Sequence, residues 1–276
     1  MSYNYDDLWC NRKKLSIFEN LIKKYKLNPK RNILIYSCFG NNHQNSKYNN
    51  YLKIFYSAEP TMENNQADYI ITFIPTKNKY ICIRNYERTE INKNGYDYKI
   101  YKSLNLNFKL TNKKKFCCFI VSDPNGPERN EFFEQISKYK KIDSLGKYKN
   151  NSDLLKNIPR EHIDYYKIIS EYKFIICFER VKKEDYITEK IYNAFYSNTI
   201  PIYWGAPNIT SLYNTKSFIN IESKDLFKEK IELIKKLDNN DELYNKYFEN
   251  KPIINPDKHD KLLENSINKI KEILSN

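Results

Sequence analysis

Residues 174–208 constrain the fold of this chain more than any other segment. Residues 174–178 form an apolar run that is typical of a short buried strand, and residues 200–204 form a second one, which Gly205 and Pro207 close as a turn. Between the two runs, apolar residues recur at helical spacing, at Ile187, Ile191, Ala194 and Phe195. This order of strand, polar loop, helix and strand is that of an open α/β sheet.

The predicted helix carries Glu189 and Lys190 in its first turn. In that turn the backbone N–H groups lack helical partners and the helix dipole is positive, so that anions bind there. We therefore expect an anionic ligand where the first strand ends and this helix begins.

Further short apolar runs extend the α/β pattern along the chain. They lie at residues 33–36, 53–56, 69–73, 116–121, 142–145 and 217–221. Helical patterns or polar segments separate them, which indicates a mainly parallel sheet. In such sheets the ligand lies beyond the carboxyl ends of the strands.

The chain is long enough, at 276 residues, for one large domain or two of ordinary size. Residues 80–110 are polar and rich in Tyr, and we interpret them as a short strand followed by an irregular connector. The sequence therefore predicts an N-terminal domain at residues 1–110 and a C-terminal domain at residues 111–250. Residues 251–276 contain a last amphipathic helix, at residues 258–274, which we expect to pack against the body of the protein.

Two charged residues follow predicted strands at positions where a ligand would lie. Glu59 comes just after strand 53–56, and Arg129 opens the helix after strand 116–121. A guanidinium there suits a phosphate because it offers a planar fork of donors. By position alone, however, a loop carboxylate is more often a solvated charge and a helix Arg more often a surface residue, so both interpretations stay open.

The net charge favours anionic partners. It amounts to +13, from 47 Lys and Arg against 34 Asp and Glu, so nucleotides, nucleic acid and acidic lipid headgroups are candidates. The basic residues are spread through the chain together with abundant Asn, Ile and Tyr, which favours a general compositional bias over one binding patch. Peripheral contact with a membrane through this basic surface is an open alternative.

Cysteine and histidine usage does not indicate a metal site. The 6 Cys are scattered without Cys-x-x-Cys spacing, and the 3 His are dispersed. No apolar run approaches the roughly 20 residues of a membrane helix, and residues 1–14 lack the apolar core of a secretory signal. We expect a cytoplasmic protein, although an anchor could lie outside this sequence.

Four blocks of residues occur in an order known from one family of glycosyltransferases. They are Phe-Tyr-Ser-Ala-Glu at 55–59, Val-Ser-Asp-Pro-Asn-Gly-Pro-Glu-Arg-Asn at 121–130, Asp-Tyr-Ile-Thr-Glu-Lys at 185–190 with Thr-Ile-Pro-Ile-Tyr-Trp-Gly-Ala-Pro at 199–207, and Ser-Phe-Ile at 217–219. Together they resemble the signature of the α1,3-fucosyltransferases of glycosyltransferase family 10. The resemblance covers most of the chain and is more specific than any single motif.

The resemblance implies a GT-B fold, an α/β architecture in which two Rossmann-like halves face a cleft, here with a reduced N-terminal half. It implies an inverting enzyme that moves L-fucose from GDP-β-L-fucose to a glycan hydroxyl, in α1,3 linkage to an acceptor of the GlcNAc or Glc type. The N-terminal half would bind the acceptor and the C-terminal half the GDP. Such a protein would require no cofactor and no metal, and a divalent cation could still stimulate it.

By position, the resemblance implies a role for each candidate residue. Glu59 matches the general base of the family. Arg129 and Lys190 match the cations at the diphosphate. Glu189 matches a carboxylate that bonds sugar hydroxyls, those of the ribose, and Tyr186 matches a donor-site tyrosine.

Two residues depart from the family pattern. Pro60 follows the base where the family commonly has Asn, and it stiffens that loop. Arg180 stands where the family commonly has Asn in the donor pocket, so it is a further donor-site candidate and opens the alternative of a different nucleotide-sugar donor. The remaining alternatives are a member that binds the GDP-sugar without catalysis and a basic nucleic-acid-binding protein. The four ordered blocks argue against nucleic acid as a partner.

Overall fold

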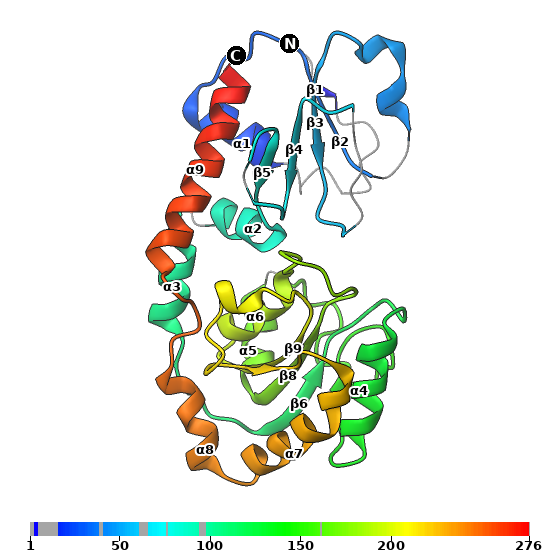
Figure 1. Cartoon of the computed structure of the whole chain (residues 1–276), viewed down its shortest axis with the longest axis vertical. Helices are drawn as coiled ribbons and strands as arrows, with labels where there is room; N and C mark the ends of the chain where they lie inside the picture. Colours follow the sequence, from blue (N-terminus) through cyan, green and yellow to red (C-terminus); the bar gives the residue numbers. More distant parts are fainter. Residues whose placement is uncertain are drawn as a thin grey trace. The chain divides into compact units, whose positions relative to one another are not determined.

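The structure is a computed structural model, and it describes residues 3–4, 16–38, 41–60, 66–75, 77–93, 98–160 and 162–275. The chain forms two compact units. The first consists of residues 1–100 and 258–276, and the second of residues 101–257. The terminal helix α9 (Pro256–Ser275) thus lies mostly in the first unit, and the fold of each unit follows separately (Figure 1).

The first unit contains a five-stranded parallel sheet whose spatial order, β1-β2-β3-β4-β5, is the order along the chain. The strands are β1 (Tyr3–Asn4), β2 (Ile33–Tyr36), β3 (Leu52–Tyr56), β4 (Tyr69–Thr72) and β5 (Tyr80–Cys82). All four residues of β2 are buried, because the strand is apolar throughout and lies inside the sheet. The predicted strands of this half are confirmed, and β1 is an addition that the sequence did not suggest.

Helices of the first unit account for the rest of its core. α1 (Ser16–Tyr25) matches the first amphipathic pattern of the chain. α9 lies beside α1 (Figure 1), and the Nζ of Lys271 lies 3.9 Å from the centre of the Tyr25 ring. The terminal helix therefore packs against the body of this unit, as expected.

Residues 80–110 begin with the expected short strand, β5, but the expectation of an irregular connector after it is wrong. After β5, this segment contains α2 (Asn85–Lys93) and α3 (Ile100–Asn107). Its apolar anchors are mostly aromatic or isolated, and the structure buries them, including Tyr86, Ile91, Tyr101 and Leu104. Tertiary burial therefore overrides the weak helical propensity of Asn, Thr and Tyr.

The second unit contains another five-stranded parallel sheet, in the order β10-β9-β8-β6-β7. The strands are β6 (Lys115–Phe119), β7 (Asp143–Ser144), β8 (Tyr172–Phe178), β9 (Ile200–Trp204) and β10 (Ile219–Asn220). From β6 the chain passes to β7 on one side and then returns to β8 on the other. The strand order thus reverses between β6 and β8, and ligands of open α/β sheets bind at such a switch point.

Helices cover both faces of this sheet. Phe174, Ile176 and Phe178 of β8 face a core shared with α4 (Pro127–Ser137) and α7 (Phe227–Asp238). On the alternate face, Cys177 donates a hydrogen bond to the backbone of α6 (Glu189–Tyr196), which packs with α5 (Ile163–Ser170). Short helices complete the unit, among them η4 (Ile209–Ser211), η5 (Lys224–Leu226), α8 (Asp241–Asn245) and η6 (Lys246–Glu249).

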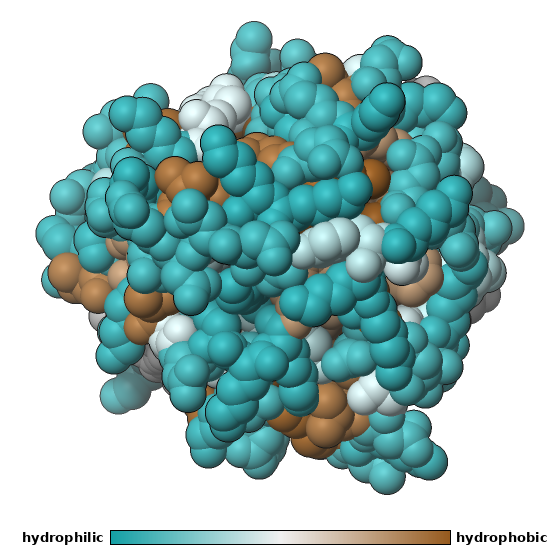
Figure 2. All heavy atoms as spheres, turned by 90° about the horizontal axis from the view of Figure 1, so that it is seen from below, coloured by the Kyte–Doolittle hydropathy of each residue, from teal (hydrophilic) through white to brown (hydrophobic). Residues whose placement is uncertain are grey.

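Residues 154–157 form a turn rather than a helix, because the left-handed Asn157, with φ 65°, interrupts the helical backbone. The face of the molecule shown in Figure 2 is mostly hydrophilic, with hydrophobic residues in separate small areas.

Candidate functional site

Arg129 lies at the switch point, in the first turn of α4 after the loop that leaves β6. Its side chain is buried, with 4 % of the residue exposed. Nη2 donates to the main-chain oxygens of Asp123 at 2.6 Å and Asn125 at 3.2 Å, while Nε has no hydrogen-bond partner among the described residues. A Cβ at Gly126 would lie 2.9 Å from the guanidinium, so a side chain at this position would displace the end of Arg129. Arg129 is therefore built into the loop and does not extend from the helix surface.

A second Arg reaches the same loop. The pKa of Asp123 is lowered by the hydrogen bond from the Asn125 N–H, and further by the charges of Arg129 and Arg180. Burial lowers the pKa of Arg129, which nonetheless stays protonated because guanidinium does not lose its proton in proteins. The structure thus brings Arg180, which follows β8, together with Arg129, which follows the neighbouring β6.

A buried carboxylate that the sequence prediction did not include, Glu179, directly precedes Arg180 and interacts with the charge of Arg129. Glu179 follows β8, and its side chain has no exposed surface. Oε1 accepts from the backbone N–H of Thr188 at 2.8 Å and from its hydroxyl at 3.0 Å, while Oε2 accepts from the same hydroxyl at 2.7 Å and from Lys190 Nζ at 3.0 Å. Glu179 therefore ties the end of β8 to the first turn of α6.

Lys190 is held as a cation by this arrangement. Burial alone lowers the pKa of Lys190, but the charges of Glu179 and Glu189, with Tyr186, outweigh burial and raise it above its ordinary value. Nζ also donates to the Thr188 hydroxyl at 3.0 Å, and 25 % of the side chain is exposed. Since an ammonium has three donors, one N–H remains for a ligand.

The two helices that begin at this edge of the sheet lack side-chain caps. Gly126 is the N-cap of α4 and has no side chain, and the hydroxyl of Thr188, the N-cap of α6, bonds Glu179 instead of the helix backbone. The N-cap side chains therefore leave both first turns uncapped, next to Arg129 in α4 and Lys190 in α6. Two such N-termini, one beside the buried Arg129 and one beside the partly buried Lys190, suit a ligand that carries several negative charges.

The loop that carries Tyr186 is fastened to the turn after β9. Asp185 has a left-handed backbone, with φ 60°. Its N–H donates to Asn208 Oδ1 at 2.9 Å, and Asn208 Nδ2 donates to Asp185 Oδ1 at 2.9 Å. The following Tyr186 is 7 % exposed. This pair of hydrogen bonds fixes how the loop enters α6.

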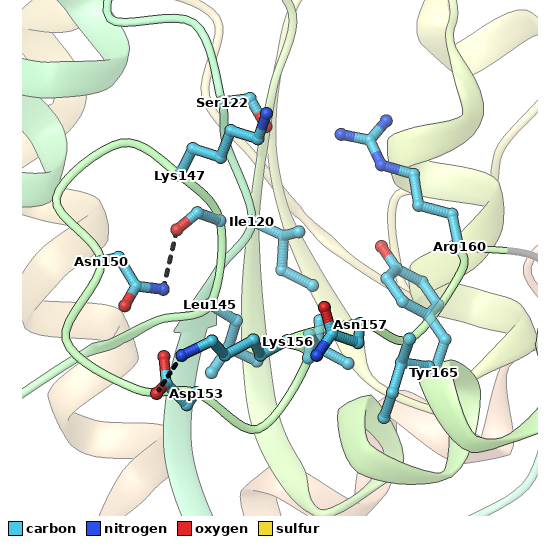
Figure 3. Close-up of a pocket in the computed structure, with 13 residues that line it drawn as sticks. Ile120, Ser122, Leu145, Lys147, Asn150, Asp153, Lys156, Asn157, Arg160 and Tyr165 are labelled. Carbon is cyan, nitrogen blue, oxygen red and sulfur yellow. Dashed lines mark hydrogen bonds and ion pairs between the residues drawn. The ribbon is translucent and has the colours of Figure 1, made fainter.

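Glu189 adjoins a cavity of the second unit. Its Oε1 accepts from Arg160 Nη1 at 3.1 Å, and Arg160 lines a cavity of about 450 Å³. Figure 3 shows the cavity between β6 and the segment after β7, lined by Ser122, Lys147, Asn150, Lys156 and Tyr165 among others. The sequence did not reveal this cavity, because residues far apart along the chain and an irregular segment form it.

Glu59 belongs to the first unit, apart from the five other candidates. It follows β3 in a turn in which its N–H donates to Ser57 Oγ at 3.1 Å. The N–H of Ser57 in turn donates to the Ile71 oxygen of the neighbouring β4 at 3.1 Å. The sheet therefore holds the backbone at Glu59 in place.

The His, Cys, Asp and Glu side chains of the described part of the chain form no cluster of three or more that could hold a metal ion. The helices described in the structure include none that is both long and apolar enough to cross a membrane.

Two α/β units, each with a parallel sheet, and a cationic edge at the switch point of the second sheet define a protein of the GT-B class. The chain belongs to glycosyltransferase family 10. The model of the C-terminal domain of this fucosyltransferase family matches residues 110–272, and that of an alpha-(1,3)-fucosyltransferase FucT N-terminal domain matches residues 3–88. The resemblance stated from the sequence blocks is therefore confirmed.

Individual relatives match parts of the chain. Alpha-(1,3)-fucosyltransferase FucT of Helicobacter pylori is 38 % identical over 125 residues, which are 45 % of this chain and 25 % of the relative. Human GDP-fucose protein O-fucosyltransferase 3 is 32 % identical over 219 residues, 75 % of this chain and 43 % of the relative. This chain therefore spans less than half the length of these two relatives.

Solved structures of the same class have the same fold. The crystal structure of an alpha1,3-fucosyltransferase with GDP-fucose superposes with a TM-score of 0.67 at 22 % identity, covering 97 % of this chain and 89 % of that one. The α/β architecture with two parallel sheets, expected from the sequence, is thus confirmed.

Proposed function

We propose that this chain is an inverting transferase that moves L-fucose from GDP-fucose to an acceptor hydroxyl. The observation that carries the proposal is the pair of helix N-termini without side-chain caps at the switch point, one beside the buried Arg129 and the other beside the partly buried Lys190. A sugar nucleotide diphosphate carries two negative charges at neutral pH and needs such a set of donors.

The donor fits the second unit in a definite orientation. The diphosphate lies against α4 and α6, where Arg129, Lys190 and Arg180 neutralise it without a metal ion. The ribose hydroxyls donate hydrogen bonds to the Glu189 carboxylate. These bonds replace part of the interaction of Glu189 with Arg160. The base enters the adjoining cavity, whose volume of about 450 Å³ is within the range of small-molecule sites. Tyr186 closes the sugar end of the donor site.

A single displacement at the sugar accounts for the residue types. The Glu59 carboxylate takes the proton of the acceptor hydroxyl while its oxygen attacks C1 of fucose from the face opposite the GDP. The bond between C1 and the phosphate oxygen breaks, and GDP leaves with the electron pair. Arg129 and Lys190 stabilise the charge that develops on the departing diphosphate. The β-linked donor therefore gives an α-linked product.

The acceptor is a glycan hydroxyl, with α1,3 linkage to a GlcNAc or Glc residue, which agrees with the name of the Helicobacter pylori relative. A Ser or Thr hydroxyl of a protein is the second candidate, because a protein O-fucosyltransferase matches 75 % of the chain. A third candidate keeps the fold and exchanges the donor, for which Arg180 is the motivating residue. The cytoplasmic location, the membrane contact and the absence of nucleic-acid partners stay predictions of the sequence.

A transfer assay tests the proposal and separates the candidates. Purified protein is incubated with GDP-fucose or other nucleotide sugars, with and without EDTA, and with N-acetyllactosamine, lactose or a folded protein substrate as acceptor. We expect fucose transfer to a sugar acceptor that persists in EDTA. Transfer from another nucleotide sugar alone would establish the changed donor, transfer to protein alone the second acceptor, and GDP-fucose binding without transfer a catalytically inactive member.

A further inference from the structure

Glu179 is not a surface charge, since its side chain has no exposed surface. It is a fully buried carboxylate at the carboxyl end of β8, and among the described residues its side chain bonds two residues of one segment, Thr188 and Lys190. Burying a carboxylate is costly unless charge and hydrogen bonds compensate it. Thr188 and Lys190 compensate it here, and in return Glu179 determines where their polar atoms point.

The first consequence concerns the N-terminus of α6. Thr is a good N-cap residue, whose hydroxyl ordinarily accepts from a backbone N–H of the first turn. In this chain the hydroxyl bonds both oxygens of Glu179, at 3.0 and 2.7 Å, and makes no cap bond. By binding this hydroxyl, the Glu179 carboxylate leaves the first turn of α6 without a side-chain cap from Thr188.

The second consequence concerns Lys190. Two N–H groups of its ammonium donate to Glu179 and Thr188. These two bonds fix the direction of the third N–H group. Facing Lys190 are Glu179 after β8, Glu189 on α6 and Tyr186 in the loop, with the Cys177 thiol bonded to the Lys190 oxygen. Among the carboxylates, Glu189 also pairs with Arg160, so Glu179 is the main counter-charge of the ammonium.

We propose that Glu179 is a positioning residue of the donor site, which holds the Lys190 ammonium and the Thr188 hydroxyl so that the N-terminus of α6 receives the donor diphosphate. The proposal rests on the proposed function, in that the ligand is a nucleoside diphosphate. Gly205 supports the arrangement, because a Cβ there would lie 2.6 Å from Glu179 Cγ.

The test uses GDP binding by calorimetry, from about pH 6.5 to 9.5. In the wild type, Lys190 stays charged across this range, and the affinity for GDP should change little above the last phosphate titration. In Glu179→Gln, burial acts on Lys190 without its main counter-charge and lowers its pKa. We expect affinity to be lower by about tenfold near neutral pH and to decline further as pH rises, by up to about tenfold per unit.

Two controls separate positioning from a general loss of structure. Glu184→Gln removes the same charge from an exposed position in the same loop and should keep the wild-type affinity and pH profile. Thr188→Val removes the hydroxyl that both Glu179 and Lys190 contact and should weaken GDP severalfold, whereas Thr188→Ser should restore it. In Lys190→Ala, adding Glu179→Gln should lower the affinity by less than it does in the wild type, because Glu179 acts partly through Lys190 and partly through Thr188.

The outcomes distinguish the two proposals. If the wild-type protein binds no GDP, the proposed donor is wrong. If it binds GDP and Glu179→Gln, folded by its melting curve, shows the same affinity and the same pH profile, the positioning role is wrong. If Glu179→Gln does not fold, equal affinities of Thr188→Val and Thr188→Ser would overturn it.

Discussion

Asn208 and Asp185 form a reciprocal pair of hydrogen bonds, each 2.9 Å long, that joins the turn after β9 to the loop before α6. Asp185 accepts a left-handed backbone at this point, with φ 60°, a conformation that Asp tolerates better than most residues. The pair therefore offsets the local strain and determines the entry of the chain into the donor site.

Asn208→Ala should lower the free energy of unfolding by about 1–2 kcal/mol, because two partly buried partners on Asp185 lose their bonds. Denaturant unfolding measures this change. Asp185→Asn is the matched control, since an amide keeps both the left-handed backbone and an oxygen that accepts from Asn208. Equal losses in both variants would mean that the pair contributes nothing specific.

Glu59→Gln should reduce the turnover of fucose transfer by about 10²–10⁴-fold, because an amide cannot accept the proton of the acceptor hydroxyl. GDP affinity should stay within about twofold, because Glu59 makes no proposed contact with the donor. Steady-state kinetics and calorimetry check the two halves of this prediction. Glu19→Gln, an exposed substitution on α1, controls for the charge change. Retained turnover in Glu59→Gln would remove this residue from the mechanism.

The secondary-structure elements that carry the candidate site could be predicted wherever local pattern determines structure. The run from β8 through α6 to β9 was recognisable because its apolar spacing changes from continuous to helical and back. Arg129 and Lys190 are candidates because a residue in the first turn of a helix that follows a strand lies near the ligand edge of a parallel sheet, and the resemblance to the family adds the diphosphate role.

Contacts distant in the sequence could not be predicted in the same way. Glu179 bonds Thr188 and Lys190 only because the loop between them returns to the end of β8. The cavity beside Arg160 forms where the segment after β7 approaches β6, a contact that no periodicity specifies. The two-residue β1 exists only through its pairing with β2.

Gly126→Ala should weaken GDP binding by about tenfold with little loss of stability. The φ of Gly126 is 167°, extended backbone that alanine also adopts, so that the backbone is not strained. The added Cβ would lie 2.9 Å from the flexible end of Arg129, which must move away from the diphosphate position. Calorimetry with GDP, together with a melting curve, tests this. Unchanged affinity would show that the position of Arg129 is not critical.

The stability of the second unit should increase with pH above neutrality because of Lys113. Its Nζ donates to the oxygens of Ser170 at 3.0 Å and Asn198 at 2.5 Å, and burial lowers the pKa of Lys113 from 10.5 to about 7. Between these values the unfolded chain binds more protons than the folded one, so stability rises with pH across this window.

The free energy of unfolding should gain at most about 1.4 kcal/mol per pH unit from this residue between roughly pH 7 and 10. Denaturant unfolding of the wild type and of Lys113→Met across this range isolates its contribution as the difference between two slopes. The Met variant should be the less pH-dependent of the two. Parallel profiles would mean that Lys113 keeps its proton throughout the range.

Ser122→Trp should separate the base of the donor from its diphosphate. Ser122 is exposed at the mouth of the cavity in the second unit, so an indole at this position can fill the space without disturbing the core. If the cavity receives the base, GDP should bind at least about tenfold more weakly, because apolar and stacking contacts of that size are lost. Inorganic pyrophosphate needs only Arg129, Lys190 and the helix N-termini. The variant should therefore bind it with an affinity within about twofold of that of the wild type.

Asn112→Trp places the same side chain at an exposed position away from the cavity and should change the affinity for neither GDP nor pyrophosphate. An equal loss for GDP and pyrophosphate would place the diphosphate in the cavity, and unchanged GDP affinity would exclude the cavity from the donor site.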